Sequence, residues 1–205
     1  MAFEALKSLS GPVLITGHTG FKGTWLSILL DRMGINHFGF SLPAQSDSLF
    51  QRLKMKEANL GMIGDVRNLD QLQKCLELVK PSVVIHLAAQ SLVLDSYINP
   101  LDTFHINSLG TANVLDASFK HSSIKSILVV TTDKVYQNDE TGKPFVESDR
   151  LGGKDPYSAS KVAAEFISAS YQTLAETRGG PRVLIARAGN VIGGGDFARN
   201  RLVPD

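Results

Sequence analysis

The chain has 205 residues, of which 43% are hydrophobic, so it is long enough to bury one substantial core. Its 21 Lys and Arg residues against 20 Asp and Glu residues give a net charge of +1, which offers no electrostatic argument for binding nucleic acid or an anionic membrane surface. The apolar stretches are far shorter than a membrane span, and the N-terminus lacks the basic-then-apolar order of a secretion signal. We therefore predict a globular, cytoplasmic protein.

Short apolar, β-branched runs alternate along the chain with longer helical patterns. The predicted strands are PVLIT (12–16), NHFGFS (36–41), NLGMIG (59–64), SVVIHLA (82–88), KSILVVT (125–131) and RVLIAR (182–187). The predicted helices span about 20–33, 69–79, 100–121 and 157–176, and the single cysteine, Cys75, is expected to pack in the second of them. Nearly all-apolar strands separated by helices are typical of a parallel sheet covered on both faces, so we predict a doubly wound α/β fold of the Rossmann type.

Three glycines follow the first predicted strand and open the first predicted helix. Gly17, Gly20 and Gly23 have the Gly-x-x-Gly-x-x-Gly spacing of a dinucleotide-binding turn. Such glycines allow a tight turn, the approach of a pyrophosphate to backbone N–H groups, and close packing of the helix on the strand. We expect Gly17 and Gly20 to contact a cofactor and Gly23 mainly to serve packing. Lys22 is either a solvated residue of the first helical turn or a phosphate contact.

The end of the second predicted strand leaves the choice between NAD and NADP open. The acid that usually holds a ribose hydroxyl is absent there, because the strand runs into Leu42 and Pro43. Arg52 and Lys54 either meet a 2′-phosphate or lie on a solvated helix face. Asp65, in the stretch GDVRN after the third strand, suits either a contact to the adenine edge or a helix N-cap.

Tyr157 and Lys161 form a second candidate group. Four residues apart on a predicted helix, they share one face, and the ammonium favours the phenolate form of the tyrosine. A phenolate beside a nicotinamide accepts the hydroxyl proton as carbon loses hydride. The fifth strand ends in Thr131-Thr132-Asp133-Lys134, which should meet this helix at the same edge of the sheet.

The chain resembles the extended short-chain dehydrogenases/reductases, and among them the nucleotide-sugar 4,6-dehydratases. The resemblance rests on TGHTGFKG (16–23), HLAAQ (86–90), TTDKVY (131–136) and RAGNVIGGGD (187–196), and within the family it is strongest to the enzymes that act on CDP-glucose. It implies an internal redox cycle. Tyr157, assisted by Lys161, deprotonates the sugar 4-hydroxyl while hydride passes to NAD⁺, water is lost across C5 and C6, and hydride returns to C6.

The same resemblance assigns roles at the end of the fifth strand. Thr132 is expected to bind the 4-oxygen and Asp133 to protonate the departing 6-hydroxyl. Many dehydratases place a glutamate next as the base for C5, whereas this sequence has Lys134. Lys134 is either the base, which requires burial or neighbouring cations, or a cation that stabilises the enolate. Besides a dehydratase for another nucleotide sugar, a nucleotide-sugar 4-epimerase and a non-catalytic NAD-binding regulator are the alternatives.

The implied site extends beyond these residues. The expected catalytic residues are Thr132, Asp133, Lys134, Tyr157 and Lys161. The expected cofactor contacts are Gly17, Thr19, Gly20, Phe21, Lys22, Gly23, Asp65, Val66, Leu87, Ala88, Ala89, Asn107, Tyr157 and Lys161. The expected substrate contacts are Gln90, Thr132 and Asn190. No metal is expected, and His86, His18 and His105 are interpreted as packing or surface residues because no second ligand lies at a suitable spacing.

The resemblance also bears on domain organisation and assembly. We expect residues 1–205 to form one NAD-binding Rossmann domain. The sequence stops at Asp205, where members of the family enter the C-terminal part that binds the nucleotide, so we expect an N-terminal fragment of a longer enzyme. The family commonly pairs through a helical bundle, which implies a homo-oligomer, at least a dimer, built on the helices near 100–121 and 157–176.

Overall fold

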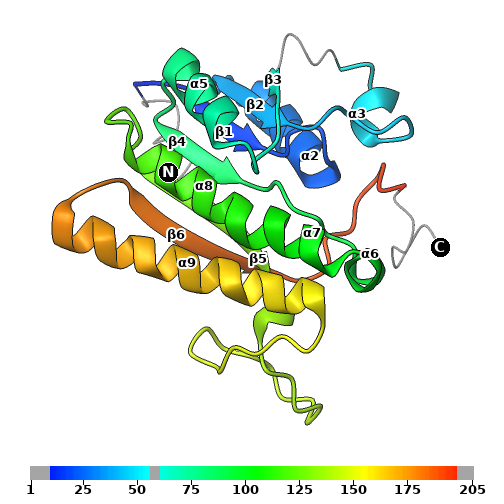
Figure 1. Cartoon of the computed structure of the whole chain (residues 1–205). Coiled ribbons are helices and arrows are strands. Elements are labelled where there is room, and N and C mark those ends of the chain that lie inside the picture. The colour runs from blue at the N-terminus through cyan, green and yellow to red at the C-terminus, as the bar shows by residue number, and fades with distance from the viewer. Residues whose placement is uncertain (1–9, 56–60, 198–205) are drawn as a thin grey trace.

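The computed structural model describes residues 10–55 and 61–197. They form a six-stranded sheet in the order β3-β2-β1-β4-β5-β6, in which every neighbouring pair is parallel (Figure 1). The strands are β1 (Val13–Thr16), β2 (His37–Ser41), β3 (Gly61–Ile63), β4 (Val83–His86), β5 (Ser126–Thr132) and β6 (Arg182–Ala188). The predicted Rossmann-type sheet is confirmed, and residues 59 and 60 of the third predicted strand lie outside the described residues.

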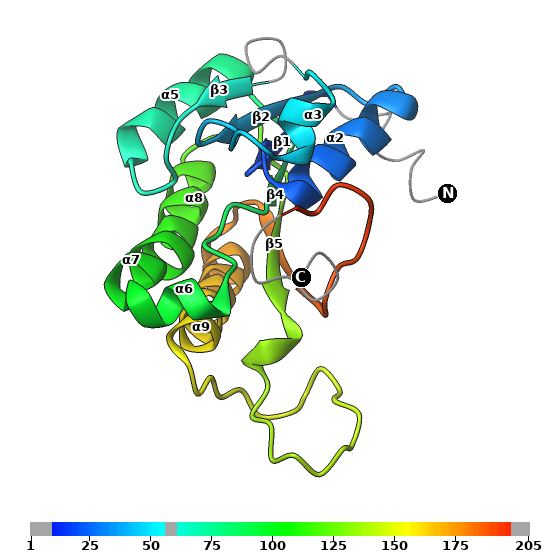
Figure 2. The same ribbon diagram turned by 90° about the vertical axis from the view of Figure 1, so that its right-hand side faces the viewer.

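Helices cover the two faces of the sheet. Helices α5 (Leu69–Val79), α8 (Gly110–Phe119) and α9 (Pro156–Arg178) lie on one side of the strands and α2 (Phe21–Arg32) lies on the other (Figure 2). Because successive strand residues point to opposite faces, Leu14 packs in the core under α5 and α8, whereas Val13 and Ile15 pack in the core under α2. Cys75 is fully buried in the first of these cores, as predicted, and burial raises the pKa of its thiol to about 12.

The predicted helix 100–121 is interrupted. It consists of α7 (Pro100–Phe104), a π-helical turn η1 (His105–Leu109) and α8. Asn107 lies fully buried in η1, and its side chain is hydrogen-bonded to two other segments of the chain. A π-helical turn places one extra residue in the helix and is frequent at functional sites.

Three short helical segments were not predicted. They are α3 (Leu49–Arg52), α6 (Val93–Ile98) and the 3₁₀ turn η2 (Asp133–Val135). Helix α3 follows β2, and the Ser48 side chain caps it by accepting a hydrogen bond from the Gln51 N–H. In the described part of the chain, no helix combines the length and the apolar character needed to cross a membrane.

The segment after β6 turns back along α2. The indole Nε1 of Trp25 donates a hydrogen bond to the carbonyl of Gly194 at 3.0 Å, and the segment runs beside α2 in Figure 2. A Cβ at Gly195 would lie 2.4 Å from the Leu49 side chain, so the segment also contacts α3. Residues 193–195 therefore pack on helix α2, which follows the glycine turn, and on helix α3.

His86 links three elements inside the core. Its Nδ1 lies 2.7 Å from the Thr16 hydroxyl of β1, and its Nε2 lies 3.0 Å from the Thr111 hydroxyl of α8. Burial lowers the pKa of His86 to about 3, and the positive charge of Lys161 adds to the shift. A neutral, hydrogen-bonded imidazole agrees with the packing role predicted for it, and the described residues contain no group of three or more potential metal ligands.

Because His86 is buried and its pKa is lowered, we predict that the folded protein loses stability in acid. Between about pH 6.5 and pH 3 the unfolded chain binds a proton at His86 that the folded chain does not, so the free energy of unfolding falls as the pH falls. The contribution is at most about 1.4 kcal/mol per pH unit. Urea unfolding at pH 7, 6 and 5 should give a shallower pH dependence for His86→Gln than for the wild type, whereas His105→Gln, at an exposed site, should match the wild type. Equal slopes for the wild type and His86→Gln would contradict this account.

Candidate active site

The predicted site residues lie along the carboxyl edge of the sheet. The chain leaves β1 for β2 on one side and returns to β4 on the other, so the strand order reverses between β1 and β4. In open parallel sheets, ligands bind in the crevice outside the strand ends at this reversal. The glycine turn follows β1, the Leu87–Gln90 segment follows β4, and Asp133 and Lys134 follow β5.

The glycine turn is built from close backbone contacts. Gly17 has φ +78°, and a Cβ there would lie 2.8 Å from the backbone nitrogen of Ala88. A Cβ at Gly23 would lie 2.1 Å from the Gly17 carbonyl oxygen, which agrees with the packing role predicted for Gly23. Gly20 is the N-cap of α2, with no side-chain cap and no acidic residue in the first turn. The N–H groups and positive end of α2 thus suit an anion such as a pyrophosphate.

Two polar residues tie this turn to the end of β2. The Thr19 hydroxyl lies 2.8 Å from the Ser41 hydroxyl and donates to the Leu42 carbonyl at 3.0 Å. His18 is buried, with its Nδ1 3.1 Å from the Ser41 hydroxyl and its ring 5.7 Å from that of Phe50. The side chains of Thr19 and His18 therefore hold the glycine turn against the end of β2. His18 thus has the packing role predicted for it.

The charged residues that follow β2 and β3 have partners in the chain. Arg52 lies 4.0 Å over the Phe197 ring and 3.9 Å from the Asp47 carboxylate, which favours packing over a 2′-phosphate contact. The N-cap of α5 is Asn68, whose side chain accepts from the Gln71 N–H, so the alternative that Asp65 caps this helix is wrong. Asp65 instead pairs with Arg67, at 2.6 Å between Oδ2 and Nη2. Its carboxylate and the adjacent Val66 N–H offer the acceptor and donor that match an adenine edge.

Tyr157 and Lys161 lie in the first two turns of α9. Asp155 caps this helix by accepting from the Ser158 N–H, and both Tyr157 and Lys161 are more than nine-tenths buried. The Lys161 ammonium donates to the Val130 carbonyl of β5 at 3.4 Å. Burial lowers the pKa of Lys161 to about 8, and the positive charge of Lys22 adds to the shift, while the Glu165 carboxylate opposes it. Through its contact with Val130, Lys161 brings the start of α9 to the end of β5.

Asn107 connects the segment after β4 to helix α9, and the cofactor contact expected of it stays a prediction. Its Oδ1 accepts from the Gln90 N–H, and its Nδ2 donates to the Gln90 carbonyl and to the Ser160 hydroxyl, each at 2.9 Å. The Gln90 amide itself is hydrogen-bonded to Leu92 and Thr103. Its side chain shapes the segment after β4, and a substrate contact there stays a prediction.

The strand ends of β5 and β6 meet. The Thr132 hydroxyl is buried, donates to Asp133 Oδ1 at 3.0 Å and accepts from the Lys134 N–H. A Cβ at Gly189 would lie 3.6 Å from Asp133 Oδ2, so β6 ends beside this carboxylate. Asp133, Lys134 and Asn190 are exposed, and the described residues therefore do not bury Lys134 as a general base would require.

Three of the predicted cofactor residues also line one cavity. A cavity of about 420 Å³ lies between α2 and the strands β4 and β5. Phe21, Lys22 and Leu87 line it together with Val130, on the strand that carries Thr132. The structure thus brings the glycine turn and the segment after β4 to one concave surface.

One buried ion pair behind the site was not identified from the sequence. Glu165 accepts from the Thr131 hydroxyl at 2.6 Å and from Arg187 Nη2 at 2.7 Å, and it is almost fully buried. Arg187 also donates to the Glu147 carbonyl in the loop before α9. Glu165 lies four residues after Lys161, on the same helix face. This spacing is the sequence signal that could have pointed to a role for Glu165 near the site.

Comparison with known proteins agrees with this geometry. A family model described as GDP-mannose 4,6 dehydratase matches residues 14–183. The chain belongs to this family. It is 39% identical over 199 residues to the CDP-glucose 4,6-dehydratase of Salmonella typhimurium, covering 94% of this chain and 55% of that protein. It is 31% identical to the dTDP-D-glucose 4,6-dehydratase of Dictyostelium discoideum, covering 88% of this chain and 44% of that protein.

Solved structures confirm the fold and include epimerases. The UDP-glucose 4-epimerase of Thermus thermophilus, solved in complex with NAD, superposes with a TM-score of 0.78 at 25% identity, covering 91% of this chain and 58% of that one. This chain spans about half the length of the curated relatives it matches. The family resemblance predicted from the four motifs is thereby confirmed.

The contact between Gly23 and Gly17 gives a direct test of the turn. Gly23→Ala places a Cβ against the Gly17 carbonyl, and we expect the free energy of unfolding to fall by about 1–3 kcal/mol or more. Gly194→Ala is the matched control, because a Cβ at Gly194 meets no atom within 4 Å, and it should change stability by less than about 0.5 kcal/mol. Urea unfolding of the two variants makes the measurement. A Gly23→Ala protein as stable as the wild type would rule out the packing role.

Proposed function

We propose that the protein is an NAD-dependent nucleotide-sugar 4,6-dehydratase that acts on CDP-glucose and forms CDP-4-keto-6-deoxyglucose. The observation that carries this proposal is the convergence of the buried Tyr157–Lys161 pair with the Thr132–Asp133 strand end beside the glycine turn. Its likeness to the Salmonella CDP-glucose 4,6-dehydratase over 94% of the chain supports the choice of reaction and substrate. A role in deoxysugar synthesis for lipopolysaccharide O-antigen follows from the same proposal.

The cofactor fits the residues at the turn. Gly17 packs against the backbone of Ala88, and the N-terminus of α2 that follows the turn has no side-chain cap and no acidic residue in its first turn. When bound, NAD supplies the chemistry of accepting a hydride from C4 of the sugar and returning one at C6. Residues 1–205 would serve as the NAD-binding domain, and the NAD-bound structure of the Thermus relative supports that assignment.

Tyr157 and Lys161 would carry the first proton transfer. The Tyr157 phenol is the group that takes the proton of the sugar 4-hydroxyl, and the Lys161 ammonium stabilises the phenolate that this transfer requires. Burial lowers the pKa of Lys161 to about 8, so at pH 7 it is mainly the ammonium that this role requires. Thr132, the last residue of β5, would donate a hydrogen bond to the 4-oxygen.

Asp133 and Lys134 would carry the elimination. Asp133 protonates the 6-hydroxyl as it departs, and its exposure at the end of β5 leaves it accessible to a sugar. Lys134 is exposed as well, which favours the second of its two roles, a cation that stabilises the enolate while another group takes the C5 proton. Asn190, exposed at the end of β6, would meet the sugar or its phosphate.

A nucleotide-sugar 4-epimerase is the second candidate. It is favoured by the structural likeness to a UDP-glucose 4-epimerase. An epimerase needs the turn and the Tyr157–Lys161 pair, but it has no use for an acid at Asp133. The product separates the two candidates, because epimerisation keeps the mass of the sugar and dehydration removes one water.

We also propose that the protein forms at least a homodimer. Apolar side chains more than half exposed gather on α6, α7, η1 and α9, which pack on one another. They are Leu94, Tyr97, Ile98, Leu101, Leu109 and Phe166. An exposed apolar patch of this kind on packed helices suits a second copy of the chain, and the molecular mass in solution tests this proposal.

Tyr157→Phe tests the catalytic assignment. It removes the proton acceptor and keeps the ring, so we expect the rate of product formation from CDP-glucose to fall by about 10²–10⁴-fold with NAD affinity nearly unchanged. Tyr171→Phe, which removes a hydroxyl further along α9, is the matched control and should keep the wild-type rate. Both variants are assayed by mass spectrometry in the longest polypeptide that contains this sequence. A Tyr157→Phe rate above one tenth of wild type would contradict the role.

A further inference from the structure

We propose that Arg67 is a positioning residue that holds the Asp65 carboxylate in place to recognise the 6-amino group of adenine. The inference rests on the proposed function in one respect, because it takes the bound dinucleotide to be NAD. It goes beyond that function by naming the residue that sets the selectivity of the site for the purine.

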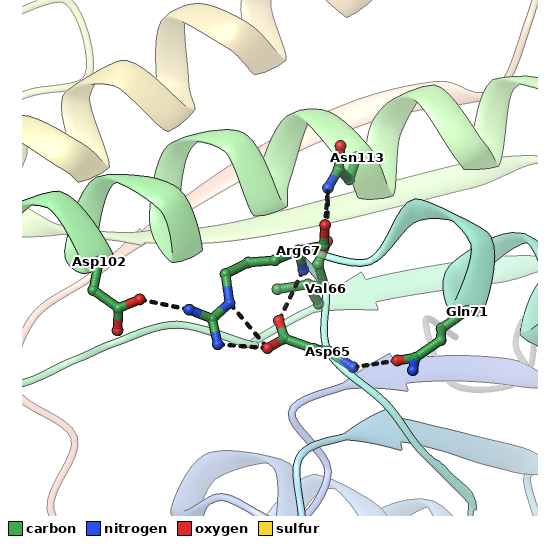
Figure 3. A network of polar contacts seen from close by, with 6 residues as sticks. All are labelled: Asp65, Val66, Arg67, Gln71, Asp102 and Asn113. Carbon is green, nitrogen blue, oxygen red and sulfur yellow. Dashed lines mark hydrogen bonds and ion pairs between the residues drawn. The ribbon is translucent and has the colours of Figure 1, made fainter.

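The Arg67 side chain folds back onto Asp65. Its Nε donates to Asp65 Oδ2 at 2.9 Å, its Nη2 donates to the same oxygen at 2.6 Å, and its backbone N–H donates to Oδ1 at 2.8 Å (Figure 3). A carboxylate offers about four acceptor positions, so Arg67 occupies three and leaves capacity on Oδ1. The guanidinium holds Oδ2 and the backbone N–H holds Oδ1, so together they fix the orientation of the carboxylate and the direction of the remaining acceptor position on Oδ1.

Arg67 also keeps this carboxylate ionised. Partial burial of Asp65 acts to raise its pKa, but hydrogen bonds from Arg67 and the guanidinium charge outweigh burial, and the pKa of Asp65 is lowered. An ionised carboxylate accepts from an amino group and repels an oxygen at the same position. The pair therefore distinguishes a purine that carries a 6-amino group from one that carries a 6-oxo group.

A second anchor fixes Arg67 itself. Its Nη1 donates to Asp102 of α7, 35 residues further along the chain (Figure 3). The backbone of the turn is held as well, since Asn113 donates to the carbonyls of Val66 and Arg67, and Gln71 accepts from the Asp65 N–H at 3.0 Å. These contacts connect α7, α8 and α5 to a single turn. Arg67 is the only member of the network that touches both carboxylates among the described residues.

The test compares two dinucleotides that differ at one position. Nicotinamide hypoxanthine dinucleotide carries an oxygen where NAD carries the 6-amino group of adenine. Calorimetric titration of the full chain should show that the wild type binds NAD at least about tenfold more tightly, the size expected for a charge-assisted hydrogen bond. In Arg67→Gln the ratio of the two dissociation constants should fall to about threefold or less, because NAD binding weakens while hypoxanthine dinucleotide binding changes little.

Further variants separate positioning from folding. Arg67→Lys keeps the charge without the planar guanidinium and should give an intermediate ratio, and Asp102→Asn removes only the outer anchor and should lower the ratio by about two- to threefold. If Arg67→Gln does not fold, Arg67→Lys and Asp102→Asn provide the test. Arg178→Gln, which removes one exposed positive charge at the end of α9, is the matched control and should keep the wild-type ratio.

The possible outcomes of these titrations lead to different conclusions. A wild type that binds NAD without preferring it over the hypoxanthine dinucleotide would overturn this inference and leave the proposed function intact. Arg67 variants that weaken both ligands equally would show a merely structural role and would overturn the inference too. A wild type that binds neither dinucleotide would overturn the proposed function itself.

Discussion

Close backbone packing at Gly17 is the constraint on which the rest of the site depends. Gly17 lies against the backbone of Ala88 on one side, and its carbonyl lies under Gly23 on the other, so β1, the segment after β4 and α2 meet without an intervening side chain. This contact places the N-terminus of α2 at the reversal of strand order, where anions bind in this type of fold. A larger residue at either glycine would separate α2 from the sheet edge and remove the anion site.

Buried polar contacts then position the reacting groups against that edge. Asn107 connects the segment after β4 to Ser160 on α9, and Ser96 accepts from the Tyr157 N–H at the start of the same helix. The Glu165–Arg187 pair ties the middle of α9 to β6. Partners this deeply buried are costly to leave unpaired, so these contacts give α9 one well-defined placement relative to β5. That placement sets where Tyr157 meets a sugar bound near Thr132.

The sequence was sufficient to predict the sheet and the elements that carry the candidate site, and the reasons are local. Nearly continuous apolar runs identify strands buried on both faces, and the 69–79 pattern matches α5 as observed. The glycine spacing, the Tyr157–Lys161 spacing and the four motifs each lie within a few residues of sequence. What escaped prediction depends on contacts between distant residues. The π-helical turn accommodates Asn107 between Gln90 and Ser160, the Arg67–Asp102 contact joins segments 35 residues apart, and helices as short as α3 show no periodicity.

The central claim is the dehydration of a nucleotide sugar, and one measurement tests it most directly. The longest polypeptide that contains this sequence is incubated with catalytic NAD⁺ and a mixture of CDP-glucose, dTDP-glucose, UDP-glucose and GDP-mannose, and the sugars are followed by mass spectrometry. The account predicts the loss of one water from CDP-glucose and from no other member of the mixture. If every sugar keeps its mass in an NAD-loaded protein, the dehydratase assignment is wrong, and an isomer of unchanged mass would identify an epimerase instead.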